Sequence, residues 1–167
     1  SGTPLRIVFV PSSHFTDFLD YKKRVDLMWG LFTDHVFFQR YLPRISAWYL
    51  ENPCSNDKHP DPAQRDLFAN EIEVLKCVKA RVPAFDPENG DVIVFFVGNP
   101  AAGNVRGTSM FEKKSLVPYE AMVNWVNMAL GLENAFVHEL SHAVGHLGDE
   151  YAGNWVNQAR PEYPNVA

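Results

Sequence analysis

Two histidines and a glutamate at residues 138–142 constrain this chain more than any other feature, because they can act together only if the segment is helical. On an α-helix, residues four apart lie on one face, about one turn apart along the axis. His138 and His142 can therefore bind a single Zn²⁺ ion from the same side. Glu139 lies one position round from His138, too far to bind the metal comfortably. It is close enough to take a proton from a water molecule at the metal.

The residues around this motif have the pattern of a helix with one apolar side. A rotation of about 100° per residue places the two histidines opposite an apolar arc that is roughly 100° wide. We predict that the apolar side packs into a core and that the histidines face a metal. The alternative is a surface helix that carries two titrating histidines. The apolar arc consists of Phe136, Leu140, Ala143, Val144 and Leu147, with Val137 at its edge.

A catalytic zinc site needs a third protein ligand, and the sequence offers Asp149, His146 and Glu150. In a straight helix, His146 would lie about 12 Å along the axis from His138, and three ligands in a row cannot form a tetrahedral site. The chain must therefore turn before the third ligand. Gly145 suits that turn, because glycine adopts a positive φ without a Cβ penalty.

Segment 138–151 resembles the catalytic motifs of zinc metallopeptidases. Metzincins carry His-Glu-x-x-His-x-x-Gly-x-x-His, and here Gly148 stands where the last His would be, so its neighbour Asp149 is the natural substitute. The ending Leu-Gly-Asp-Glu-Tyr at 147–151 resembles that of the IgA-peptidase family, the igalysins, whose motif ends in Leu-x-Asp-Glu-Tyr at the same distance. Looser similarity, in the family's order, covers most of the chain.

The resemblance implies an α/β fold with a metzincin-like (zincin) catalytic domain. In that arrangement a twisted, mostly parallel sheet lies above a cleft, and the helix with the zinc motif lies below it. The resemblance implies that His138, His142 and Asp149 hold Zn²⁺ and that Glu139 is the general base. Tyr151 would line the site or assist the oxyanion, and packing beneath the site is the alternative role for it. The resemblance further implies a secreted or extracytoplasmic protein.

Three features depart from the family pattern. Ser141 stands where the family commonly has Gly before the second His, and His146 is an additional histidine. A metzincin has a methionine turn after the third ligand, whereas the four methionines here, at 28, 110, 122 and 128, all precede it. We therefore expect residues 1–167 to form a single catalytic domain that is truncated at its C-terminus.

Alternating strand and helix patterns along the chain predict a layered α/β fold. The apolar run at 91–98 is the strongest strand and is expected at the centre of the sheet. Residues 99–109 are expected to form a loop and an edge strand, the latter within 105–111, and residues 116–126 are expected to be extended. The other predicted elements are strands at 5–10 and 45–50, helices at about 17–32 and 66–82, a short helix from Asp34 that Pro43 ends, a loop at 52–64, and the metal helix at about 132–145.

The composition excludes several classes of protein. The net charge is −5 and the basic residues are scattered, so no nucleic-acid partner is expected. No apolar run is long enough for a membrane span. Cys54 and Cys77 either form a disulfide, which we favour because it suits an exported peptidase, or remain free thiols. The remaining histidines, His14, His35 and His59, are expected to be solvated or structural.

Together these features predict a zinc metalloendopeptidase that acts on a protein or peptide, with a secreted host glycoprotein as one candidate substrate. Two alternatives remain open. One is a binding or adhesin module that retains a peptidase fold, and the other is a zinc hydrolase of non-peptide substrates.

Overall fold

The computed structural model describes residues 4–13, 15–65 and 69–96, two further strands at 106–110 and 122–126, and the two helical residues Val137 and Leu140. Within these residues the chain forms a five-stranded sheet in the order β2-β1-β3-β5-β4. The strands are β1 (Leu5–Pro11), β2 (Ile45–Tyr49), β3 (Val92–Phe96), β4 (Arg106–Met110) and β5 (Met122–Val126), and the main helices are α1 (Phe18–Asp34), α2 (Val36–Gln39) and α3 (Glu71–Arg81).

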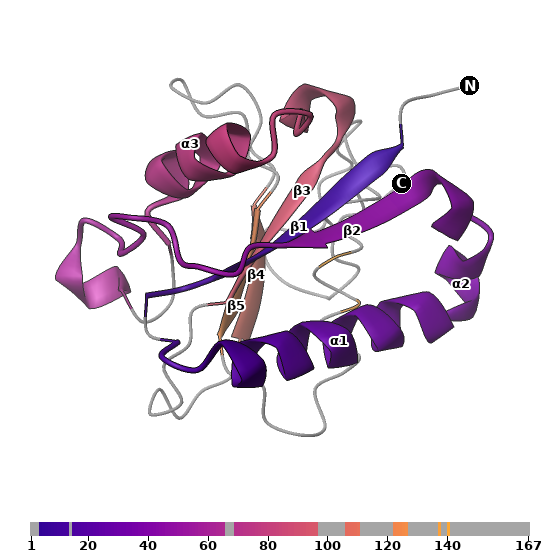
Figure 1. Cartoon of the computed structure of the whole chain (residues 1–167), viewed down its shortest axis with the longest axis horizontal. Coiled ribbons are helices and arrows are strands. Elements are labelled where there is room, and N and C mark those ends of the chain that lie inside the picture. Colours follow the sequence, from indigo (N-terminus) through magenta and orange to yellow (C-terminus); the bar gives the residue numbers. More distant parts are fainter. Residues whose placement is uncertain are drawn as a thin grey trace, which may run out of the picture.

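Four strands of the sheet are parallel, and the edge strand β4 is antiparallel to its neighbour β5. The predicted α/β fold and mostly parallel sheet are thereby confirmed. β3 is the middle strand of the five, as the run at 91–98 predicted, and β4 and β5 fall inside the segments expected to be an edge strand and an extended stretch. Helices α1 and α3 cover opposite faces of the sheet (Figure 1).

Residues 7–11 of β1 and all of β3 are apolar because both faces of these strands are buried. Alternate residues of a strand point to opposite faces, so a strand covered on both sides has no position for a polar side chain. Ile7 and Phe9 of β1 pack on the α1 side, whereas Val8 and Val10 pack on the α3 side. All five residues of β3 are buried. The core of the molecule therefore has two halves with the sheet between them.

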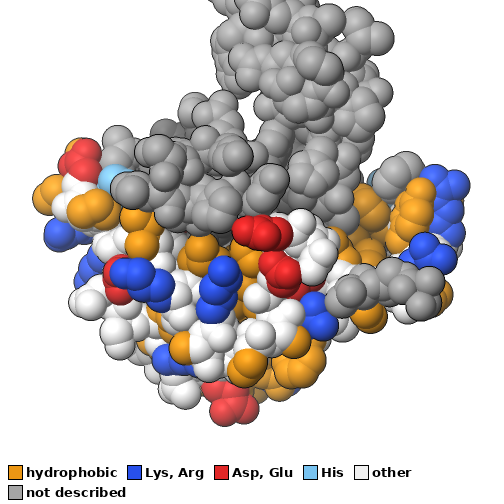
Figure 2. Space-filling model, turned by 90° about the horizontal axis from the view of Figure 1, so that it is seen from above, with side chains coloured by type: hydrophobic (Ala, Val, Ile, Leu, Met, Phe, Trp, Pro, Cys, Tyr) orange, Lys and Arg blue, Asp and Glu red, His pale blue; other side chains and the backbone are white. Residues whose placement is uncertain are grey.

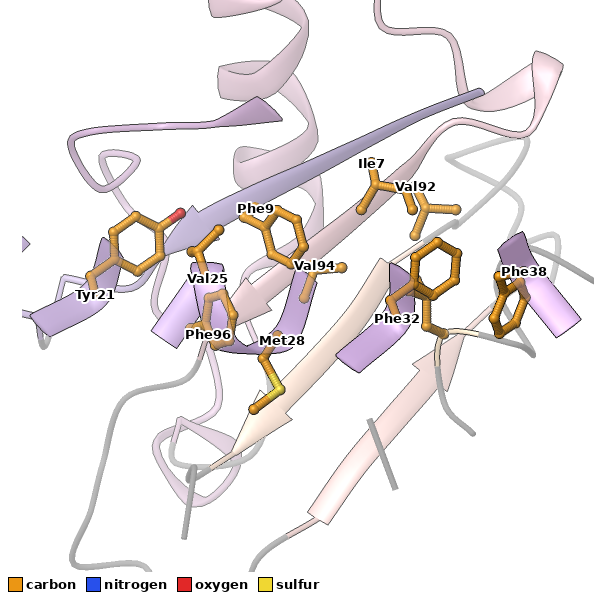
Figure 3. Close-up of a cluster of buried hydrophobic side chains, with 11 residues drawn as sticks. Ile7, Phe9, Tyr21, Val25, Met28, Phe32, Phe38, Val92, Val94 and Phe96 are labelled. Carbon is orange, nitrogen blue, oxygen red and sulfur yellow. The ribbon is translucent and has the colours of Figure 1, made fainter. Parts of the chain in front are cut away.

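Helix α1 forms because its apolar residues recur at intervals of three and four and its first turn is capped. The carboxylate of Asp17 accepts a hydrogen bond from the Leu19 backbone N–H at 2.8 Å, which satisfies one of the free donors at the helix start. Figure 3 shows the apolar side chains of α1 directed at the sheet strands. The α1 residues buried there are Tyr21, Val25, Met28 and Phe32.

The segment after α1 corrects two expectations. The short helix α2 begins at Val36, after His35, rather than at Asp34. Pro43 does not end that helix. It lies inside a separate 3₁₀ turn, Leu42–Arg44, where proline is tolerated because the first N–H groups of a helix have no internal partner. Phe38 of α2 stacks on Phe32 with ring centroids 4.3 Å apart, which holds this segment on the α1 half of the core.

Helix α3 starts later than the sequence pattern predicted. It begins at Glu71, because Ala69 is extended and pairs with Lys58, and the Asn70 backbone N–H donates to the Asp57 carbonyl at 2.7 Å. The sequence also predicts an apolar face made of Leu67, Ile72, Leu75 and Val78 or Val82, and this prediction is partly wrong. Val74 and Val78 are the buried residues of α3, whereas Ile72 is exposed. Leu67, which was expected on this face, lies outside the described residues.

The turn before β3 is fixed by a buried carboxylate. Asp91 accepts hydrogen bonds from the Arg6 backbone N–H at 2.7 Å and from the Asp86 backbone N–H at 2.8 Å. The Arg6 guanidinium pairs with it at 3.1 Å. Gly90 has a φ of 90°, which only glycine adopts without strain. These contacts join the start of β1 to the turn before β3, and both strands contribute residues to the two halves of the core.

Candidate functional site

The helix predicted to carry the metal motif is represented in the described structure by two residues, Val137 and Leu140. Both are helical. Leu140 is fully buried, with 0% of its surface exposed, and belongs to the α1 half of the core together with Ile7, Phe9 and Phe32. Val137 is partly buried against the same cluster. The prediction that Leu140 lies on a buried apolar side of a helix, with Val137 at the edge of that side, is confirmed.

The residues that would carry the chemistry lie outside the described residues. They are His138, Glu139, His142, Asp149 and Tyr151, together with the alternative ligands His146 and Glu150. Their proposed roles stay predictions. What the structure contributes is the orientation of the helix at Leu140, since a helix position buried in the core fixes which positions can face away from it.

Helix geometry converts the burial of Leu140 into an expectation for the two histidines. At about 100° per residue, positions 138 and 142 each lie about 160° from position 140, and only about 40° from each other. Position 137 lies about 60° from position 140, which agrees with the partial burial of Val137. If the helix is regular around Leu140, we therefore expect positions 138 and 142 to lie on the same side of the helix and to face away from the core.

The strands supply a second element of the candidate site, an edge. β4 pairs with β5 from Arg106 opposite Val126 to Met110 opposite Met122, and it is the last strand in the sheet order. An edge strand has backbone N–H and C=O groups directed outward, which can pair with an extended peptide. The expectation of an edge strand within 105–111 is confirmed, and substrate binding along it stays a prediction.

Two of the other histidines have the ordinary surroundings expected of them. His35 is exposed and lies beside the Phe38 ring at a centroid distance of 5.5 Å. His59 accepts a hydrogen bond at Nδ1 from the Asp61 backbone N–H at 3.2 Å. His14 lies outside the described residues. Within the described part of the chain, no group of three or more His, Cys, Asp or Glu side chains is placed to hold a metal ion.

Cys54 and Cys77 are joined in a disulfide, so the favoured alternative for this pair is confirmed. The bond ties the loop after β2 to α3, and Arg81 at the end of α3 reinforces it. Its guanidinium donates to the carbonyls of Asn52 at 2.6 Å and Pro53 at 3.1 Å. Both sulfurs are used in this bond, and neither thiol is available to bind a metal.

Buried polar groups at the carboxyl end of β1 were not foreseen from the sequence. Ser12 and Asp57 are almost completely buried, and the Asp57 carboxylate accepts a hydrogen bond from the Ser13 backbone N–H at 2.5 Å. This contact joins residues 44 positions apart, so no local pattern indicates it. It holds the loop at 50–70 against the end of the strand.

Tyr21 is a buried tyrosine whose hydroxyl has no hydrogen-bond partner in the described structure. Its ring packs edge-on against Phe15 and Phe96, with centroids 5.7 Å away in each case. Burial, with a smaller contribution from Tyr49, raises the pKa of Tyr21 far above its ordinary value of 10.0. The group therefore stays neutral in the folded protein.

Among the described residues on the face seen in Figure 2, the charged side chains do not gather into one patch of a single sign. There, Lys and Arg side chains occupy several separate positions among apolar and uncharged ones. Within the described residues, no helix is both long and apolar enough to cross a membrane. The expected lack of a nucleic-acid partner stays a prediction.

Comparisons with known proteins add no family to these observations. A scan of the chain against protein-family models found no match, and a search of curated proteins found none either. The motif at 138–142 and the burial of Leu140 are therefore the features that bear on function.

Proposed function

We propose that this chain is a zinc-dependent metallopeptidase, with an endopeptidase activity, in a metzincin-like catalytic domain. The observation that carries the proposal is the complete burial of Leu140 in a helical segment. The motif requires a helix with one apolar side packed in a core. Leu140, which is predicted to lie on that apolar side, is helical and buried in the core. If the five-residue motif had arisen by chance, residue 140 would not need to be helical and buried.

The donor types at the proposed site suit Zn²⁺. Two neutral imidazoles, from His138 and His142, and one carboxylate, from Asp149, form a ligand set that leaves a fourth position open. Zn²⁺ bound there would act as a Lewis acid on a peptide carbonyl and would lower the pKa of water. The ligand from beyond Gly145 would come from His146 or Glu150 if Asp149 does not serve.

Glu139 has the role of general base in this proposal. It accepts the proton of the attacking water and later delivers it to the leaving amine nitrogen. Tyr151 would line the site or stabilise the developing oxyanion. The outward backbone groups of β4 would bind the substrate as an added strand, which places a peptide bond in a fixed orientation.

The disulfide supports a location outside the cytosol. Disulfides persist in oxidising compartments and are rare in the cytosol, where thiols are kept reduced. With Cys54 bonded to Cys77, we propose a secreted or extracytoplasmic enzyme acting on proteins or peptides, of which a secreted host glycoprotein is one candidate.

The decisive experiment compares Glu139→Gln with the wild-type chain in zinc content and in cleavage of an unfolded protein substrate. We expect both proteins to hold about one zinc per chain. We expect the variant to cleave at least about 100-fold more slowly, because the proton acceptor is lost while the ligands remain. Glu88→Gln is the matched control, since Glu88 is exposed, lies on the turn before β3 and is no part of the motif.

Two results would overturn the proposal: purified protein that holds no zinc after incubation with the metal, or a Glu139→Gln variant that cleaves as fast as wild type. Zinc binding without cleavage of any peptide would point to one of the alternative functions instead. Zinc affinities of Asp149→Ala, His146→Ala and Glu150→Ala, measured side by side, would identify the third ligand as the residue whose removal weakens binding most.

A further inference from the structure

Strand β2 forms the edge of the described sheet opposite β4. It pairs in parallel with β1, from Leu5 opposite Ile45 to Phe9 opposite Tyr49. In the described structure no strand pairs with its other side. Edge strands of this kind are usually blunted by lysine, proline or a bulge, and the sequence of β2, Ile-Ser-Ala-Trp-Tyr, contains neither of these residues.

The backbone pattern shows which groups of β2 face outward. The Leu50 backbone N–H donates to the Phe9 carbonyl at 3.0 Å, so the backbone N–H and C=O groups of residue 50 point toward β1. Along a strand, the N–H and C=O of one residue point to the same side and alternate with those of the next residue. The backbone N–H and C=O groups of Ser46 and Trp48 therefore also point toward β1, whereas those of Ala47 and Tyr49 point away from the sheet.

Large aromatic side chains flank these outward backbone groups on both faces of the sheet. Trp48 is 50% exposed and lies on the α3 face, because its register partner Val8 does. Tyr49 is 41% exposed and lies on the α1 face, where its ring is 6.1 Å from that of Phe18. An open edge with exposed aromatic side chains on either face is a surface for strand pairing rather than a solvated strand.

The charges at the two ends of β2 indicate which strand fits. Arg44 precedes the strand and Glu51 follows it at one residue's distance. Both are exposed, and within the described residues neither takes part in an ion pair shorter than 4.0 Å. A second copy of β2 running antiparallel would bring Arg44 of each chain toward Glu51 of the other. A copy running parallel would place like charges together.

We propose that β2 pairs antiparallel with β2 of a second copy of this chain, which joins the two sheets across a two-fold axis at Trp48. In this register Ala47 lies opposite Tyr49 of the other copy, and the free N–H and C=O groups of both residues are satisfied in two symmetric pairs. The two Trp48 side chains lie directly opposite one another, an arrangement that stabilises cross-strand pairs. Glu51 lies opposite Ile45, one residue from Arg44.

This register is also favoured by the hydrogen bonds already present in the chain. The Ile45 N–H donates to the Leu42 carbonyl and is not free to pair with a second strand. A register centred on Ala47 would need that donor, whereas one centred on Trp48 does not. The interface is independent of the proposed peptidase site, because β2 and β4 are the two opposite edges of the sheet.

The test is the oligomeric state of the 167-residue chain, measured by sedimentation velocity from about 5 to 200 µM, a range suited to the micromolar affinity of a small interface. We expect a monomer–dimer equilibrium. Ala47→Pro should raise the dimer dissociation constant at least about tenfold, because it removes an outward N–H and places ring atoms at the edge. The ladder to β1 does not use that N–H, so the variant should retain the fold, which its thermal unfolding curve will show.

Charge-reversal variants distinguish a second copy of this chain from any other partner of the β2 edge. Arg44→Glu and Glu51→Arg should each weaken the dimer by about three- to tenfold, and the double variant should recover the wild-type dissociation constant to within about twofold. Trp48→Glu, which places two carboxylates opposite each other, is a further variant that should abolish dimerisation. A chain that remains monomeric to the highest concentration, a dimer that Ala47→Pro does not weaken, or a double variant without recovery would overturn the proposal.

Discussion

Replacing Leu140 by alanine tests whether the motif helix is anchored in the core. Leu140 is fully buried and belongs to the same core cluster as Ile7, Phe9 and Phe32. The substitution removes three carbon atoms from this cluster and leaves a cavity among packed aromatic and β-branched residues. We expect the free energy of unfolding to fall and the motif helix to lose its main point of attachment.

The size of the effect follows from the burial. Loss of three buried carbons costs about 2.4 kcal/mol at ~0.8 kcal/mol each. The cavity adds to that, because packed surroundings relax only in part, so the total is about 3 kcal/mol or more. For a chain of this length, that corresponds to a fall in the melting temperature of roughly 6–12 °C.

Urea denaturation in the presence of a chelator is the appropriate measurement, because zinc bound to the folded state would otherwise add to its stability. Leu27→Ala is the matched control. Leu27 is 47% exposed on α1, and the same chemical change there should alter stability by less than about 0.5 kcal/mol. If Leu140→Ala lowers the free energy of unfolding by less than about 1 kcal/mol, or by no more than the control does, the motif helix is not anchored in the core. The main support for the proposed site would then be lost.

Two further predictions concern the disulfide and the buried tyrosine. The disulfide links residues 23 apart, so the double variant Cys54→Ser/Cys77→Ser should lose about 3 kcal/mol in the free energy of unfolding. A loss below about 1 kcal/mol would show that the disulfide does not stabilise the fold as proposed. Because the Tyr21 hydroxyl has no partner in the described structure, Tyr21→Phe should stabilise the fold by up to about 1 kcal/mol at neutral pH. Burial raises the pKa of Tyr21 above 10.0, so the unfolded chain ionises first. The titration of Tyr21 therefore leaves the free energy of unfolding unchanged below about pH 10 and lowers it above that pH. Between pH 8 and pH 11, the unfolding midpoint should fall less in Tyr21→Phe than in wild type.

The elements that the sequence predicted well are those whose pattern is set by burial. Residues 7–11 of β1 and all of β3 are apolar because both faces of these strands are covered. The apolar residues of α1 recur at helical intervals because only one side of the helix is covered. Leu140 was placed correctly for the same reason, since its position in the apolar arc depends on the helical period alone.

The errors lie where contacts distant in sequence override the local pattern. The predicted start of α3 is too early because Ala69 pairs with Lys58, which keeps the chain extended where the helical pattern would continue. The buried Asp57 was missed because its partner, the Ser13 N–H, lies on another element. The third zinc ligand is subject to the same difficulty. It comes after a turn, and the geometry of a turn depends on what the chain packs against.

The pairing of β1 also has a consequence for synthesis of the chain. Its two neighbours lie far apart in sequence, and the Arg6–Asp91 contact that joins the starts of β1 and β3 spans 85 residues. At about 5–20 residues per second, a ribosome needs roughly 4–17 s to make that span. During this time the apolar run of β1 has emerged without its central partner. Exposed apolar segments of this kind are what chaperones protect from aggregation. Among the described strands, β1 therefore waits longest for its central partner.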